Sequence, residues 1–104
     1  RKPDSQETQN MTQTPKLQDL LQFPALIPVK AVSHKGVPAE TFRLEMIDLT
    51  VRHVPGFSAE LISIRASSSG NYYAVTLSAT FVDIDQFHAL DAALKQHPLV
   101  RMVL

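Results

Sequence analysis

The segment from Tyr72 to Phe81 constrains the fold of this chain more than any other part of the sequence. Larger apolar side chains alternate along it with small or polar ones. Because successive side chains of a β-strand point to opposite faces, this alternation predicts a strand with one face in a core and the other uncovered. Such a strand belongs to an antiparallel sheet that is covered on one side only. We expect the core row to be Tyr73, Val75, Leu77, Ala79 and Phe81, and the outward row to be Tyr72, Ala74, Thr76, Ser78 and Thr80.

Three more strands and two helices are predicted around this segment. Alternating apolar residues indicate strands at residues 26–33, 57–67 and 99–104. Helical spacing indicates one helix over residues 38–53 and a second between Asp83, its N-cap, and Pro98. The order strand–helix–strand–strand–helix–strand is that of the ferredoxin-like α+β sandwich. We therefore predict an antiparallel sheet of strand order 4-1-3-2, with both helices on one face.

The first predicted helix carries two apolar stripes instead of one. Phe42, Met46, Leu49 and His53 form the stripe that we expect to face the sheet. The second stripe lies well around the helix and consists of Leu44, Ile47, Val51 and Val54. It either packs against the second helix or an N-terminal arm, or forms an interface with a partner.

The length of 104 residues is that of one domain with one modest core. Residues 1–15 are polar and are predicted to be a disordered tail. Residues 16–104 are predicted to form a single ferredoxin-like domain. We expect it to open with a short amphipathic helical arm, which ends at Pro24 and carries Leu17, Leu20 and Leu21 on one face.

Composition excludes several classes of function. The absence of cysteine excludes a disulfide scaffold, a zinc ribbon and thiol catalysis. Ten Lys and Arg residues balance ten Asp and Glu residues, so net charge favours neither nucleic acid nor an anionic membrane as partner. No apolar stretch approaches the roughly 18 residues of a membrane span. We expect a cytoplasmic protein with no cofactor, no nucleic-acid partner and no membrane partner.

The predicted topology brings three loops to one end of the sheet. These loops contain His34, Lys35 and Gly36, then the hairpin residues Ser68 and Asn71, and finally His97. The first helix begins at the same end, where its free N–H groups and partial positive charge favour an anion. We expect Val37 to be its N-cap, which has no side-chain oxygen to accept those N–H groups. The alternative is that Glu40 and water satisfy the helix and that the Ser-rich run is only a turn.

Other sites on this fold are disfavoured by the residues present. The four histidines lack metal-ligand spacing, so no metal site is expected. Acylphosphatases hold phosphate with an Arg in the first loop, where this chain has Lys35, a point charge without the bidentate fork. RNA-binding sheets of this shape stack bases on aromatic residues, and Tyr72 alone is available in the outward row. We therefore expect no enzymatic activity and no RNA binding.

Four short motifs resemble those of the YbeD-like family of small bacterial proteins. They are LLQFP at residues 20–24, RHVPG at 52–56, SSSGNY at 67–72 and the terminal VRMVL at 100–104. The resemblance covers residues 16–104. It implies a fold like the ACT regulatory domain and, because genes of the family often lie beside lipoate-synthesis genes, a link to lipoate metabolism. It supplies no catalytic residues.

These observations lead to two hypotheses about function. The first is a small non-enzymatic regulatory or binding module of ACT-like fold that senses a small anionic metabolite at the loop end. The second is a protein–protein adaptor without a ligand, for which a protein partner or a second copy of the chain would cover the second stripe of the first helix.

Overall fold

The computed structural model describes residues 22–104. The predicted tail, residues 1–15, lies outside them, as does the part of the arm that carries Leu17, Leu20 and Leu21. Phe23, at the end of the arm, packs half-buried against the core. No helix within residues 22–104 combines the length and the apolar character that crossing a membrane requires.

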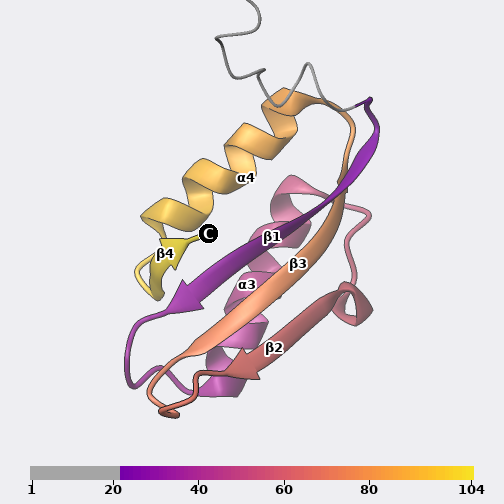
Figure 1. The fold of residues 1–104 in the computed structure, drawn as a ribbon. Helices are drawn as coiled ribbons and strands as arrows, with labels where there is room; N and C mark the ends of the chain where they lie inside the picture. Colours follow the sequence, from indigo (N-terminus) through magenta and orange to yellow (C-terminus); the bar gives the residue numbers. More distant parts are fainter. Residues whose placement is uncertain (1–21) are drawn as a thin grey trace, which may run out of the picture.

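Four strands form one antiparallel sheet, and two helices pack on one of its faces. The strands are β1 (Ala25–Ser33), β2 (Ile62–Ala66), β3 (Tyr73–Phe81) and β4 (Val100–Val103); the helices are α3 (Ala39–His53) and α4 (Ile84–Gln96). The strands are ordered β2-β3-β1-β4, which is 4-1-3-2 when read from the other edge, the order that the sequence predicts. Figure 1 shows α3 passing behind β1 and β3, so that the opposite face of these strands carries no helix of residues 22–104.

The alternation along β3 has the predicted consequence. Val75, Leu77, Ala79 and Phe81 are at most 1% exposed, whereas Thr76 and Ser78 are half-buried and Thr80 is exposed. The helices cover the apolar row, and Phe87 of α4 packs edge-on against Phe81 with ring centroids 5.4 Å apart. Both helices contribute fully or nearly fully buried side chains to this core, namely Phe42, Met46, Leu49, Leu90 and Leu94.

Helix α3 begins one residue later than the sequence suggested. Its N-cap is Pro38 and not Val37, because Pro38 has extended backbone angles while its carbonyl already accepts the first helical hydrogen bond, from Phe42 N at 3.0 Å. Thr50 is fully buried and donates to Met46 O at 2.7 Å. His53, which the sequence had assigned to the stripe facing the sheet, is only half-buried.

Strand β2 is shorter than predicted. Residues 57–61 do not belong to it: Ala59–Leu61 form a turn of 3₁₀ helix, and Phe57 is 5% exposed within the core before that turn begins. An apolar side chain in a loop can therefore be buried as fully as one in a strand, which the pattern of alternating residues does not distinguish. Within Ile62–Ala66 the predicted alternation holds, with Ile62 and Ile64 packed against the core.

The start of α4 is held by its predicted N-cap and is tied to the end of α3. Asp83 Oδ1 accepts a hydrogen bond from Gln86 N at 2.8 Å, which confirms Asp83 as the cap. The Gln86 amide accepts from Val82 N at 2.7 Å and donates to His53 O at 2.9 Å. One glutamine side chain thus closes the first turn of α4 and binds the last carbonyl of α3.

A buried hydroxyl completes the hydrogen bonding where β1 ends. The pairing of β1 with β3 stops at Val32 and Ala74. Beyond it, Ser33 is fully buried, and its Oγ accepts from Tyr73 N at 3.0 Å and donates to His34 O at 3.0 Å. A side chain therefore replaces the next rung of the ladder.

Truncating the apolar row of β3 should cost far more stability than truncating the opposite row. We expect Leu77→Ala to lower the free energy of unfolding by about 2–5 kcal/mol, because it leaves a cavity in the core. Thr76→Ala, on the neighbouring residue, should lower it by less than about 1 kcal/mol. Urea denaturation followed by circular dichroism measures both, and equal losses would contradict the assignment of faces.

Removal of the Ser33 hydroxyl should also lower the free energy of unfolding, although only one oxygen atom is lost. We expect Ser33→Ala to destabilise the domain by about 1–3 kcal/mol, because Tyr73 N–H loses its partner in a buried setting. The control is Ser63→Ala, the same change at an exposed strand position, which should stay within about 0.5 kcal/mol of the wild type. The hydrogen bond would be unimportant if the two variants had the same denaturation midpoint.

Candidate functional site

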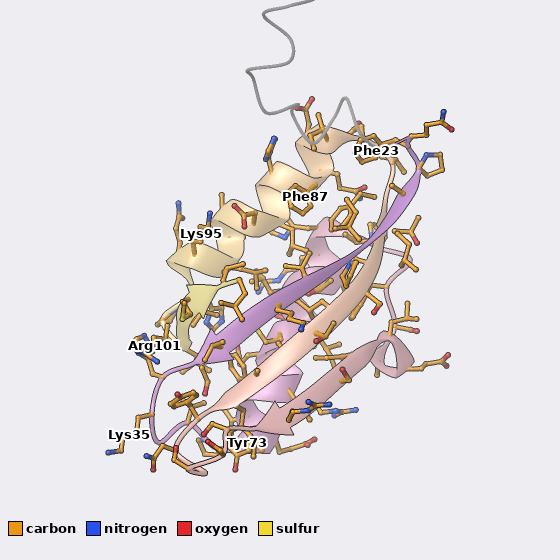
Figure 2. The ribbon with its side chains drawn as sticks, viewed as in Figure 1. Phe23, Lys35, Tyr73, Phe87, Lys95 and Arg101 are labelled. Carbon is orange, nitrogen blue, oxygen red and sulfur yellow. The ribbon has the colours of Figure 1, made fainter. Side chains whose placement is uncertain are left out.

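Three loops meet at one end of the sheet, as the topology predicted. Gly36 N donates to Asn71 O at 3.2 Å, which joins the β1–α3 loop to the β2–β3 hairpin. His34 N donates to Leu99 O at 3.0 Å, which joins the same loop to the turn before β4. We call residues 34–38, 67–71 and 97–99 the loop cluster. Figure 2 shows Lys35 and Tyr73 at this end of the molecule and Phe23 at the other.

The β1–α3 loop presents its polar residues to solvent. His34, Lys35 and Gly36 are all exposed. Gly36 has φ of 86°, a left-handed conformation in which a side chain would be strained. Gly36 therefore lets the chain turn sharply from β1 toward α3, and Lys35 is an exposed residue of the loop between them.

The hydroxyls of the β2–β3 hairpin are used within the hairpin itself. Ser67 Oγ lies 3.2 Å from Ser69 Oγ and accepts from Tyr72 N at 3.4 Å, while Ser69 Oγ accepts from Asn71 N at 3.4 Å. Ser68 and Asn71 are exposed at the tip, and the Asn71 carbonyl accepts the hydrogen bond from Gly36. Of these two predicted site residues, Asn71 therefore touches the first loop through its backbone.

The structure places the side chain of His97 away from the predicted site. Its Nδ1 accepts from Leu99 N at 3.1 Å, so that Nε2 carries the hydrogen and donates to Glu45 Oε1 at 3.4 Å. The side chain is only 12% exposed. His97 therefore links the α4–β4 turn to α3, and it brings an acidic residue, Glu45, next to the loop cluster.

The start of α3 offers backbone donors. The N–H groups of residues 39–41 precede the first helical hydrogen bond, and the N-cap Pro38 makes no side-chain bond to them. Glu40 is exposed and pairs with Arg43 at 3.2 Å. This end of the helix therefore combines free donors, the partial positive charge of the helix and Lys35 nearby.

The second stripe of α3 is not a continuous exposed surface. Val54 is 5% exposed and belongs to the core, because it follows the last helical residue and its chain turns inward toward Phe57. Ile47 is half-buried against the core. Leu44 and Val51 remain exposed, by 52% and 37%. Two of the four residues that we had assigned to an interface are thus packed within the domain.

Two hollows lie away from the loop cluster, and neither was found from the sequence. A cavity of about 250 Å³ at the opposite end has a mainly apolar lining, which includes Val54, Phe57, Leu61 and Val82. A second hollow of about 210 Å³ lies on the helix-free face of the sheet and is lined by Lys30, Ser63, Ile64, Arg65, Ala74 and Thr76. For the second hollow, the signal in the sequence was one cation in the outward row of each of two strands, namely Lys30 in β1 and Arg65 in β2.

The part of the chain that the structure describes holds no cluster of three His, Asp or Glu side chains placed to bind a metal ion.

Comparison with known proteins identifies the family. Residues 18–104 match the family model described as "Protein of unknown function (DUF493)". The UPF0250 protein of Vibrio parahaemolyticus is 35% identical over 86% of this chain and 91% of its own length. That of Leptothrix cholodnii is 31% identical over 90% of this chain and its whole length.

A solved structure shows a related fold. The solution structure of protein HP0495 from H. pylori aligns with all of this chain and 96% of its own with a TM-score of 0.52, at 12% identity. The sequence matches confirm the resemblance that the four motifs indicated. The chain belongs to the DUF493/UPF0250 family of small bacterial proteins, the YbeD-like family.

Proposed function

We propose that this domain is a non-enzymatic regulatory module of ACT-like fold that binds a small anionic metabolite at the loop cluster. The observation that carries the proposal is the start of α3, where the N–H groups of residues 39–41 have no side-chain cap and Lys35 lies in the adjoining loop. Phosphate and carboxylate groups bind at such helix ends, because several N–H groups point at one place.

Charge at this end of α3 also favours an anion. The one acidic side chain in the first turn, Glu40, is paired with Arg43 at 3.2 Å. Within residues 22–104, Lys35 makes no ion pair. Because the site is open to water, we expect weak binding, for which each exposed charge contact contributes about 1 kcal/mol or less.

The same residues support a binding role over a catalytic one. Within residues 22–104, side-chain hydrogen bonds join no serine hydroxyl to a histidine ring, the pairing that a nucleophile and its base require. The Ser67 and Ser69 hydroxyls are engaged in their own turn. We place this module in the cytoplasm and, from the gene neighbourhood of the family, in the regulation of lipoate metabolism.

A protein–protein adaptor without a ligand is the alternative. It is favoured by Leu44 and Val51, which are large apolar side chains exposed two turns apart on the same side of α3. An adaptor should show no response to small anions. Its partner, a second copy or another protein, should bury these two side chains.

A titration with inorganic phosphate and with succinate, followed by amide chemical shifts, tests the proposal. We expect shifts at residues 34–41 and 67–71. Lys35→Ala should weaken binding by up to about fivefold, because it removes one exposed charge contact. Lys95→Ala is the matched control: Lys95 is paired with Asp91 on α4, and its loss should leave the affinity unchanged. The absence of shifts at tens of millimolar would reject the site and favour the adaptor.

A further inference from the structure

We propose that the helix-free face of the sheet is a docking surface for an acidic segment of a partner polypeptide. We call this surface the basic sheet face and define it by Lys30 of β1, Arg65 of β2 and Arg101 of β4. It includes the short side chains between Lys30 and Arg65, which are Ser63, Ala74 and Thr76. It is separate from the loop cluster, and its ligand is a chain and not a small anion.

The four strands contain no acidic residue. Within residues 22–104 every Asp and Glu lies in a helix or in the turn before α4; these residues are Glu40, Glu45, Asp48, Glu60, Asp83, Asp85 and Asp91. The zero net charge of the sequence therefore conceals a division into an acidic helix layer and a basic sheet. A surface of one sign attracts partners of the other sign and repels its own.

The cations of the two layers also differ in their partners. The basic residues of the helices each form an ion pair one turn away, namely Arg43 with Glu40, Arg52 with Asp48 and Lys95 with Asp91. Lys30, Arg65 and Arg101 are exposed and have no carboxylate partner among the described residues. Arg101 instead lies over the Tyr72 ring, 5.5 Å from its centroid. No carboxylate side chain of residues 22–104 therefore neutralises these three cations.

The groove on this face lies between two of the cations. Lys30 pairs across the sheet with Thr76, which pairs in turn with Ser63, and the next row places Arg65 opposite Ala74. Short side chains on β3 therefore separate longer ones on β1 and β2, which produces the hollow of about 210 Å³. Figure 1 shows β1, β3 and β2 side by side with neither α3 nor α4 in front of them.

The spacing of the charges fits an extended chain. Lys30 and Arg65 lie on strands two positions apart, which separates their backbones laterally by roughly 10 Å. Arg101 lies on the other side of β1, so the three cations span the whole sheet. A single small anion cannot contact all three, whereas an extended peptide places alternate side chains about 6.8 Å apart and reaches several. Ser63 and Thr76 can donate to its carbonyls.

A polypeptide fits this face better than a nucleic acid does. Sheets that bind single-stranded RNA stack its bases on exposed aromatic rings. Tyr72, the aromatic residue that the sequence assigned to the outward row, precedes β3, is half-buried and is already contacted by Arg101. The groove floor of Ala74, Thr76 and Ser63 offers hydroxyls and no stacking surface.

Fluorescence anisotropy with the full chain tests the docking surface. The probe is a labelled peptide of 12 residues in which Glu alternates with Ser, and the comparison is the same peptide with Gln in place of Glu. We expect the acidic peptide to bind, the Gln peptide not to bind, and the affinity to fall as salt is added. Amide shifts should appear on β1, β2 and β3 around Lys30, Ser63, Arg65 and Thr76.

Two double variants that each remove two positive charges, one on the sheet and one on the helices, show where the peptide binds. Lys30→Gln with Arg65→Gln should weaken the acidic peptide about tenfold, because two exposed charge contacts are lost. Arg52→Gln with Lys95→Gln removes the same charge from the helix layer and should change the affinity by less than twofold. Lys30→Arg with Arg65→Lys keeps both charges and should retain binding. Lys35→Ala should have no effect here, so this proposal and the proposed function can fail separately.

Four outcomes would overturn the proposal. Equal binding of the Gln peptide would show that charge does not drive the interaction. Equal weakening by the two double variants would show that the peptide responds to net charge and not to this face. Amide shifts confined to the loop cluster would place the anion there. Tighter binding of a 12-nucleotide oligouridine than of the acidic peptide, with shifts at the same strand residues, would make the surface a nucleic-acid site.

Discussion

Burial of one row of side chains on β3 is the constraint on which the rest of the structure depends. Val75, Leu77, Ala79 and Phe81 are covered by both helices, and their strand is central in the sheet, paired with β1 on one side and β2 on the other. Because side chains alternate, covering this row leaves the opposite row without a layer above it. That row is small and polar, which permits it to face water. The face on which a partner can be received is therefore a consequence of how the core is built.

At the two ends of the sheet, some backbone N–H and C=O groups have no hydrogen-bond partner within a strand pair or a helix, and other groups satisfy them. Where β1 ends, the Ser33 hydroxyl accepts a hydrogen bond from the N–H of Tyr73. The following loop donates one hydrogen bond to the hairpin, from Gly36 N, and one to the turn before β4, from His34 N. Where α3 ends, the Gln86 side-chain amide donates a hydrogen bond to the last helical carbonyl, that of His53. The two ends thus differ in kind: one collects polar loops around a free helix start, and the other is closed by a side chain above an apolar cavity.

Much of the fold could be predicted from the sequence, because it rests on local periodicity. The alternation of β3, the Asp83 cap and the meeting of three loops at one end all follow from residues near one another in the chain or from topology. The errors have a common cause in long-range contacts. His97 turns toward Glu45, 52 residues away, and Val54 and Phe57 enter the core from a loop. A pattern read along the chain records apolar character but not which neighbour a side chain meets.

The basic sheet face shows why a summed charge is a poor guide to partners. Equal numbers of acidic and basic residues argued against nucleic acid and an anionic membrane as partners, as long as the charges were taken to be mixed. Helices place opposite charges one turn apart, where they neutralise each other locally, as Arg52 and Asp48 do. On a sheet, long side chains of opposite charge can pair across neighbouring strands. Because β1 to β4 carry no acidic residue, Lys30, Arg65 and Arg101 keep a field that the composition does not reveal.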